Sequence, residues 1–476
     1  MTKLKLALVI SVLSFCHKII AQKDTIKLEE VIVSTNRISL PNFKTSRTLN
    51  IISKKDIQST SASNLADLLQ NIAGIDIRRR GVDGTQSDLY IRGGNFDQTL
   101  LLIDGIKMDD AQTGHHIMNA VLSLDNIERI EIIKGPAARV FGQNAFAGAI
   151  NIITKRVTKN SLKASLGYGS FDNKKGSLGF ANTFKDGNFQ LHAEKQNSNG
   201  FRYNSDFDNT SLFLKTNIKK NQFLATFNSR NFGANGFYAS PDYKDQYEET
   251  QTSLVAFSSL YKTDKLEIKP RVSWRRNQDM YLFLRQDPSY FRNFHISNKL
   301  SAETNMVLSS KLGKTGFGID AGKVFLASSN LGNHNRFMLT SFLEHRFEVG
   351  NFDATPGIAF THFSDFGTKA FPGLDMGYSI NVNFKLYGNI GYTYRIPTYT
   401  DLYYDGPTTM GNPKLKPESA LAEELGIKYI ATRFNFNLAL FNRDSENLID
   451  WTKENEADRW QTKNFGKVQP KVLKCH

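Results

Sequence analysis

Two short groups of polar residues have side chains that could bind a metal ion. His115 and His116 are adjacent in TGHH, and Asp206 and Asp208 alternate in NSDFDNTS. Adjacent histidines cannot share one helical face as ligands four residues apart do, so we expect this pair in a loop. The aspartates are candidate calcium ligands because calcium prefers oxygen donors, but a solvated loop is the simpler interpretation.

Conventional catalytic motifs are missing from the sequence. The segment GPAARVFG lacks the Lys-Ser/Thr pair of a phosphate-binding loop, and neither G-x-S-x-G nor H-E-x-x-H occurs. The net charge of +14 comes from basic residues spread along the chain, with RRR at 78–80 as the only tight run. The sequence therefore predicts neither an enzyme nor a nucleic-acid-binding protein, and no cofactor apart from the candidate calcium.

The first residues have the pattern of an export signal. In MTKLKLALVISVLSFCHKIIAQ, two lysines precede an apolar core, and Ala21 is a suitable cleavage site. Lipid attachment at Cys16 is the alternative, but Phe15 stands where such a site has a small residue. We therefore expect residues 1–21 to be a signal peptide. No later apolar run reaches the roughly 18 residues of a membrane helix.

Two regions with different periodicities follow the leader. From 44 to 155, short strands, the first of them predicted in TLNIISKKDI, mix with a helix whose apolar residues recur in SASNLADLLQNI. This mixture predicts a small α+β domain. From 156 to 476, apolar and polar residues alternate, as in FNFNLALF and INVNFKLYGNIGYTY. A soluble sandwich would alternate in this way too. Strands of about ten residues, joined by alternating short and long connections, favour an antiparallel transmembrane β-barrel.

Several ordered motifs of the first region resemble those of the TonB-dependent outer-membrane receptor family. They are LADLLQNIAGIDI, YIRGGNFDQTLLLIDGIKMDD and IERIEIIKGPAARVFGQNAFAGAINIITK. NFGANGFYASPDYKDQYEETQT and RIPTYTDLYYDGPTTMGNPKLKPESALAEELGIKY extend the resemblance, nearest the vitamin B12 and siderophore receptors. The resemblance implies that residues 44–155 form a plug inside a barrel of about 22 strands in the outer membrane of a Gram-negative bacterium.

The resemblance also marks positions in the plug. Glycines there permit tight turns between strands. Charged residues there could form ion pairs with a polar barrel wall and loosen the plug when force breaks them, although solvated charges are an equal alternative. The marked positions are Arg92, Gly93, Gly94, Asp104, Gly105, Glu131, Lys134, Gly135, Arg139 and Gly142.

LEEVIVSTNR, within the segment 22–43, resembles the TonB box of this family. In the family the box pairs with a strand of TonB, so the backbone hydrogen bonds come from another protein. The alternative is an ordinary first strand of the plug sheet. The centre of the box is Glu30, Val31, Ile32, Val33 and Ser34.

The resemblance implies energised uptake of a bulky, scarce nutrient such as a cobalamin or a ferric siderophore. TonB and its inner-membrane energising complex, the barrel-assembly machinery, outer-membrane lipid and the nutrient are then the partners. A receptor that binds without transport and a secreted hydrolase are the alternatives. Plug loops of this family face the binding cavity, which makes Asp109, Asp110, Gln112, His115 and His116 the candidate ligand-binding residues.

The region 156–476 is short for a complete barrel of this family. At roughly twenty residues per strand and connection, it provides about 14 to 16 strands. The chain ends in NFGKVQPKVLKCH, whereas family members end in an amphipathic strand with a terminal aromatic residue. We therefore expect a partial barrel from a truncated or frame-shifted product, and an inactive product is a further alternative to import. A smaller barrel closed at 14 or 16 strands is the alternative.

Overall fold

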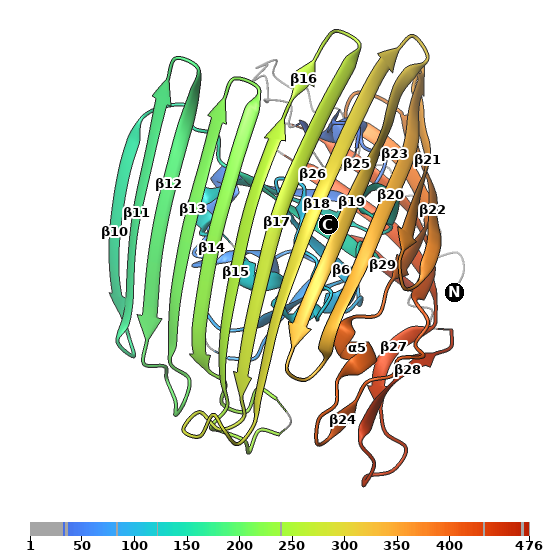
Figure 1. The fold of residues 1–476 in the computed structure, drawn as a ribbon. Coiled ribbons are helices and arrows are strands. Elements are labelled where there is room, and N and C mark those ends of the chain that lie inside the picture. Colours follow the sequence, from blue (N-terminus) through green and yellow to red (C-terminus); the bar gives the residue numbers. More distant parts are fainter. Residues whose placement is uncertain are drawn as a thin grey trace, which may run out of the picture. The chain divides into compact units, whose positions relative to one another are not determined.

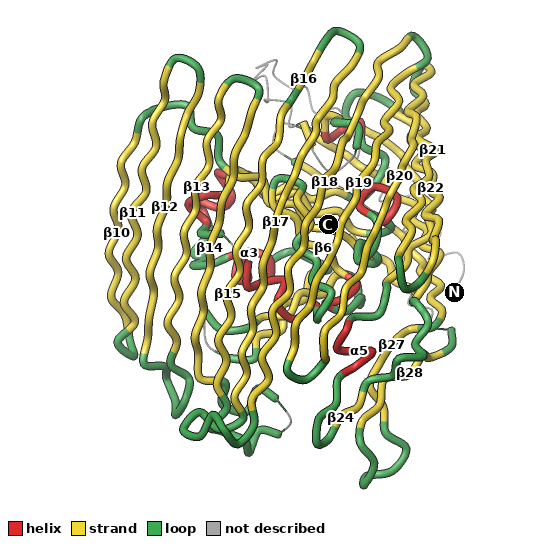
Figure 2. The backbone as a smooth tube through the Cα atoms, viewed as in Figure 1, coloured by secondary structure: helices red, strands yellow, loops and turns green. Residues whose placement is uncertain are grey.

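A large antiparallel sheet and a small mixed domain dominate the computed structural model (Figures 1 and 2). The structure describes residues 32–33, 37–81, 84–120, 122–238, 240–431, 434–467 and 471–475, all within the unit Ile32–His476. The expected signal peptide and the box residues Glu30, Val31 and Ser34 lie outside the described residues.

The large sheet, called the wall below, runs in sequence order from β10 to β29. Its strands are β10 (Ser161–Gly169), β11 (Asn173–Phe184), β12 (Gly187–Ser198), β13 (Phe207–Ile218), β14 (Asn221–Gly233), β15 (Tyr247–Ser259), β16 (Tyr261–Lys262), β17 (Leu266–Leu282), β18 (Arg292–Ser310), β19 (Gly313–Ser328), β20 (Gly332–Val349), β21 (Phe352–Phe363), β22 (Gly367–Ser379), β23 (Phe384–Arg395), β25 (Glu418–Ile430), β26 (Asn435–Glu446) and β29 (Lys471–Cys475).

These seventeen described strands occupy sixteen positions, because β16 continues β15 along β17 in the same register. Within the described ranges, no pairing joins β10 to β29. Several strands exceed the expected ten residues, and β18 has 19. A tilted strand crosses a bilayer in about 9 to 11 residues, so the remainder of such a strand extends beyond it.

The side chains of the wall alternate in the sense of a membrane protein. Along β20, Leu343 and Phe347 are 54% and 44% exposed, whereas the intervening Arg346 is only 3% exposed. Along β23, Leu386 and Ile390 are exposed in the same way. A soluble sandwich would bury the apolar face, so this pattern excludes it and confirms the transmembrane expectation.

The two ends of the wall differ in the length of their connections (Figure 1). One end, called the turn end, has short connections such as 219–220, 263–265 and 311–312. The other, called the loop end, has the long connections 234–246 and 396–417. The loop end also carries α5 (Tyr399–Tyr403) and a small sheet of β24 (Thr409–Met410), β28 (Trp460–Phe465) and β27 (Leu448–Thr452).

The plug contains a five-stranded sheet and a separate hairpin of β4 (Ile75–Arg79) and β5 (Ser87–Ile91). The sheet has the order β3 (Leu49–Ser53), β8 (Ile127–Lys134), β9 (Gly148–Thr154), β6 (Thr99–Ile103) and β7 (Ile106–Lys107). The helices and helical turns of the plug are α2 (Lys54–Ser59), α3 (Leu65–Gln70), α4 (Ala138–Phe141), η2 (Phe96–Gln98), η3 (Gly114–Ala120) and η4 (Leu124–Asn126).

Local sequence explains where the plug helices begin. The side chain of Asn64 accepts a hydrogen bond from the Asp67 amide and so caps α3, as the apolar spacing predicts. TLNIISKKDI is strand only up to Ser53. This correction has a local cause, because Ser53 and Asp56 form a reciprocal capping box that starts α2.

The plug core is continuous with the inner side of the wall. Leu69 and Ile130 are fully buried in the plug, and their cluster includes Phe213 and Leu254 of the wall. Burial of this shared apolar surface favours docking of the plug against β13 to β15. None of the helices in the described part of the chain is long and apolar enough to cross a membrane.

Candidate functional site

Arg92 connects the plug to the wall through a buried ion pair. Its guanidinium lies 2.5 Å from the Glu424 carboxylate of β25, and the two side chains are 2% and 0% exposed. The guanidinium also lies over the ring of Phe441, 4.2 Å from its centroid. Thr48 donates a 2.7 Å hydrogen bond to the other oxygen of Glu424. Arg92 is therefore paired with the wall rather than solvated.

The turn that carries Arg92 needs its glycines for two different reasons. Gly93 has φ 71°, a left-handed conformation that favours glycine. Gly94 lacks a positive φ, but a Cβ there would lie 2.4 Å from the Ala147 Cβ. This tight turn directs Arg92 out of the plug.

Arg139 forms a second connection at the α4 turn. Its guanidinium lies 2.7 Å from Asp375 and 3.3 Å from Glu344. Arg47 reaches the same Asp375 carboxylate at 2.5 Å. Two plug arginines therefore share wall carboxylates in a buried cluster.

Asp104 forms a third connection, between β6 and β7. Its carboxylate accepts hydrogen bonds from Thr154 and lies 3.0 Å from Lys215 Nζ of β13. Arg271 donates to the backbone carbonyls of Asp104 and Gly105. Burial alone would raise the pKa of Asp104, but Lys215 and Thr154 outweigh it, so that this pKa lies below its usual range.

Glu131 and Lys134 have identified partners within the plug. Glu131 pairs with Arg129 at 2.7 Å, and Lys134 donates a 2.6 Å hydrogen bond to the Ala73 carbonyl. Both side chains stabilise the plug itself. Among the charged motif residues, Arg92 and Arg139 form the kind of ion pair with the wall that the sequence suggested.

The candidate ligand-binding residues lie near the loop end of the wall, and most are occupied by wall contacts. Asp109 lies 2.6 Å from Lys299, and Asp110 accepts hydrogen bonds from Asn277 and Ser297. Gln112 donates to the carboxylate of Asp279. All three candidates are buried. They therefore hold residues 109–112 of the plug, called the plug apex below together with η3, against β17 and β18 in this structure.

The two adjacent histidines have different surroundings. His115 stacks on Phe96 with ring centroids 3.9 Å apart, and its Nδ1 lies 2.8 Å from Asp88. His116 is buried, and its Nε2 lies 3.3 Å from Asp279. Burial alone would lower the pKa of His116, but Asp279 and Glu248 raise it to about 9. The expected loop location is wrong, because both residues lie in η3.

Asp206 and Asp208 are each paired with a cationic side chain. Arg285 donates two hydrogen bonds to Asp206, at 2.7 and 2.9 Å, and Lys195 pairs with Asp208. These cations neutralise both carboxylates, and Asp208 lies within β13 rather than in the expected solvated loop.

The described part of the box pairs with the chain itself. Ile32–Val33 (β1) is antiparallel to Leu40–Pro41 (β2) in a separate two-stranded sheet. The residues after β2 include η1 (Asn42–Lys44). The centre of the box is thus extended, but in the described residues it belongs to neither plug sheet.

The segment 37–48, called the strap below, connects the box to the plug, and the wall holds it by its backbone. Arg346 and Lys385 both donate to the Lys44 carbonyl at 3.0 Å, and Lys428 donates to the Thr45 carbonyl at 3.0 Å. Sequence reasoning missed these wall cations. Their only sequence signal is a position on the polar face of an alternating strand.

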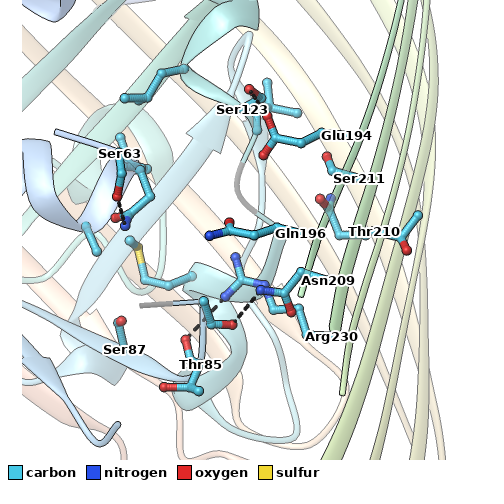
Figure 3. Close-up of a pocket in the computed structure, with 18 of the residues that line it drawn as sticks. Ser63, Thr85, Ser87, Ser123, Glu194, Gln196, Asn209, Thr210, Ser211 and Arg230 are labelled. Atoms are coloured by element: carbon cyan, nitrogen blue, oxygen red, sulfur yellow. Dashed lines mark hydrogen bonds between the residues drawn. The ribbon is translucent and has the colours of Figure 1, made fainter. Parts of the chain in front are cut away.

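A polar cavity of about 100 Å³ separates another edge of the plug from β12 to β14 (Figure 3). Glu194, Gln196 and Asn209 line it from the wall. Arg230 reaches across to the Thr85 carbonyl at 3.5 Å. Polar contacts, rather than a packed apolar surface, thus connect plug and wall here.

An apolar exterior, a polar interior and a plug held by buried ion pairs together define a plugged outer-membrane barrel protein. Residues 41–149 match the TonB-dependent receptor plug domain, and residues 143–469 match the TonB-dependent receptor-like β-barrel. The chain belongs to the TonB-dependent receptor family of the Gram-negative outer membrane. Members of this family bind small-molecule nutrients and interact with TonB.

Relatives and solved structures are similar to most of the chain. A vitamin B12 transporter, BtuB of Vibrio vulnificus strain CMCP6, is 25% identical over 448 residues, covering 89% of this chain and 71% of the relative. BtuB of Photobacterium profundum is 22% identical, covering 96% and 76%. The siderophore receptor PirA of Pseudomonas aeruginosa has TM-score 0.72 and 18% identity, covering 91% and 82%. At that identity, the structural likeness shows the fold alone.

The pairing of Asp104 with Lys215 predicts an acid-resistant carboxylate. A depressed folded-state pKa gives stability that is fully present above the unfolded value of about 3.9 and is lost as the pH falls through the folded value. We therefore expect Asp104 to protonate with a midpoint below the ordinary value of about 3.9. Infrared difference spectra of the purified protein against Asp104→Asn would isolate its carboxyl band.

Lys215→Met is the matched control for this measurement. It removes the cation but keeps the burial, so the Asp104 carboxyl band should appear at a higher pH than in the unmodified protein. A protonation midpoint of Asp104 at or above about 3.9 in the unmodified protein would contradict the assignment.

Proposed function

We propose that this receptor imports a bulky, scarce nutrient of the cobalamin or ferric siderophore type, using force that TonB delivers from the inner-membrane energising complex. The observation that carries the proposal is the set of buried ion pairs between plug and wall, centred on Arg92–Glu424 and Arg139–Asp375. A plug attached in this way blocks free diffusion of a large solute along its side. Work is then needed to move it.

The choice of cargo rests on the relatives. Sequence relatives that are similar over most of the chain are named vitamin B12 transporters, and the structural neighbours include siderophore receptors. Both cargo classes are large and polar. The loop end, with its connections 234–246 and 396–417, would face outside and receive the nutrient. His115 is the most accessible of the five candidate ligand-binding residues.

The proposed path of force begins at the box, Glu30 to Ser34, and enters the strap. Because Arg346, Lys385 and Lys428 hold the strap by its backbone, tension would act on these contacts before it reaches the plug core. Arg47, at the end of the strap, shares Asp375 with Arg139. Force on the strap would therefore reach a connection between plug and wall. Outer-membrane lipid and the barrel-assembly machinery complete the proposed partners, and we propose no catalytic activity.

Transport assays with whole cells test this proposal. Cells that express the chain and lack other receptors of this type should accumulate labelled cobalamin or a labelled ferric siderophore. Accumulation should stop when the inner-membrane gradient is collapsed, because the outer membrane has no energy source of its own. Binding that persists without energised accumulation would favour a non-transporting receptor. If the cells neither bind nor accumulate a cobalamin or a ferric siderophore, the proposed cargo is wrong.

A further inference from the structure

A buried group of three possible metal ligands lies where the plug meets the wall near the loop end. It consists of His116 of η3, Glu248 of β15 and Asp279 of β17, with one ligand atom from each lying within 4.8 Å of the others. The strand register explains how the wall brings its two carboxylates together. Asp279 pairs with Thr250, two residues from Glu248, so both carboxylates lie on the same face of adjacent strands.

Two oxygens of this group lack hydrogen-bond partners. Glu248 Oε1 and Asp279 Oδ1 are both buried without one, and their residues are 1% and 8% exposed. Burial of a carboxylate oxygen is costly unless a donor or a cation satisfies it. His116 Nε2 lies 3.3 Å from Asp279 Oδ2, and its Nδ1 lies 3.9 Å from Glu248 Oε1. A cation bound by the group would satisfy the two unsatisfied oxygens.

We propose that His116, Glu248 and Asp279 bind a divalent first-row transition-metal ion, with Zn²⁺ as the best fit. One imidazole and two carboxylates form a ligand set of the kind that Zn²⁺ accepts, whereas Ca²⁺ takes oxygen ligands alone. Among the described residues, no other group of three such side chains is assembled in this way. The site goes beyond the proposed import function, since it does not depend on which nutrient is carried.

Neighbouring residues are suited to support the ion. Asn119 Nδ2 lies 3.0 Å from His116 Nδ1, while its own Oδ1 is buried without a partner. A half-turn of this amide would let Oδ1 accept from Nδ1–H and leave Nε2 free for the metal. Tyr238, from the connection 234–246, donates to the second oxygen of Glu248. His295 of β18 is the cross-strand partner of Asp279 and provides an additional imidazole on the wall.

The bound ion would connect the plug apex to two strands of the wall. The metal would join η3 to β15 and β17 through coordinate bonds, which are stronger than the ion pair between His116 and Asp279. A metal-loaded plug should therefore resist proteolysis in η3 better than a metal-free plug.

Metal titration of the full-length protein tests the proposal. The protein, purified from outer membranes without a histidine tag and treated with chelator, would be titrated with Zn²⁺ by calorimetry and with Co²⁺ as a visible-absorption probe. We expect one equivalent of either ion, with Co²⁺ bands showing nitrogen and oxygen ligands. Millimolar Ca²⁺ should not displace the bound metal. Absence of stoichiometric Zn²⁺ and Co²⁺ binding, or displacement by Ca²⁺, would overturn the proposal.

The adjacent histidines provide a matched pair of variants. His116→Gln should abolish the site, whereas His115→Gln should bind metal as the unmodified protein does. Glu248→Gln keeps the size of the side chain and should weaken binding at least about tenfold. Heat-modifiable migration in gels would establish that each variant is folded. If the folded His116→Gln and Glu248→Gln variants bind metal as tightly as the unmodified protein, the assignment is refuted. It is also refuted if only His115→Gln loses metal binding.

Discussion

Replacing Arg92 with alanine is expected to reduce uptake strongly while ligand binding persists. The substitution leaves Glu424 buried, with an exposed fraction of 0%, and without its cation. Removing one partner of a buried ion pair costs roughly 3 to 5 kcal/mol. The cost falls on the contact between plug and wall, far from the exposed loops. Equilibrium binding of the nutrient and its energised uptake would be measured separately on the same cells.

Arg78→Ala is the matched control, because it removes a plug arginine whose ion pair is exposed. Arg78 lies 3.0 Å from Asp76, with side chains 64% and 60% exposed, and such a pair contributes at most about 1 kcal/mol. Arg92→Ala combined with Glu424→Ala should recover part of the lost plug stability, since no uncompensated charge is left. Unchanged uptake by Arg92→Ala would rule out a role for this pair in transport.

Replacing Ile32 with proline is expected to reduce energised uptake strongly. Ile32 lies at the centre of the proposed box, and the described structure shows it in an extended strand. Proline removes the backbone N–H that a paired strand donates, and leaving the partner carbonyl unsatisfied costs roughly 1 to 3 kcal/mol. Since each 1.4 kcal/mol is a factor of ten, coupling to TonB should fall by roughly 5- to 150-fold. Uptake rates and crosslinking to TonB would measure the effect.

Ile32→Val is the control for side-chain size, because it keeps both the backbone donor and the β-branched shape. Nutrient binding should be unchanged in either variant, since the described part of the box, Ile32–Val33, lies outside both plug sheets. Normal uptake by Ile32→Pro would show that this segment is not the site of TonB pairing. Loss of binding in the proline variant alone would instead assign the segment a structural role in the plug.

Local rules account for the parts of the fold that the sequence predicted correctly. The side-chain period of two along β20 and β23 places apolar residues outside whatever the neighbouring strands are, so alternation alone indicates a membrane wall. The apolar spacing of α3 and its Asn64 cap are equally local. The strand-to-helix change at Ser53 was missed, because the capping box overrode an apparent strand.

Partner assignment was beyond the reach of sequence reasoning. Arg92 and Glu424 are separated by 332 positions, and Lys385 lies 341 positions from the strap carbonyl that it holds. Strand register and plug docking determine which charges meet, and single-sequence patterns contain neither. For the same reason, the sequence suggests that Asp109 and Asp110 are available to a ligand. In the structure, both carboxylates instead contact side chains of the wall.

The sequence by itself determined the class of protein, because alternation and ordered motifs reflect backbone periodicity and local turns. Tertiary structure alone decided which polar residues are paired and which are left unsatisfied. Adjacent His115 and His116 show the difference, since one stacks on Phe96 and the other meets two wall carboxylates. Neighbours in sequence differ here because burial and electrostatics depend on distances in space, which only the docked plug sets.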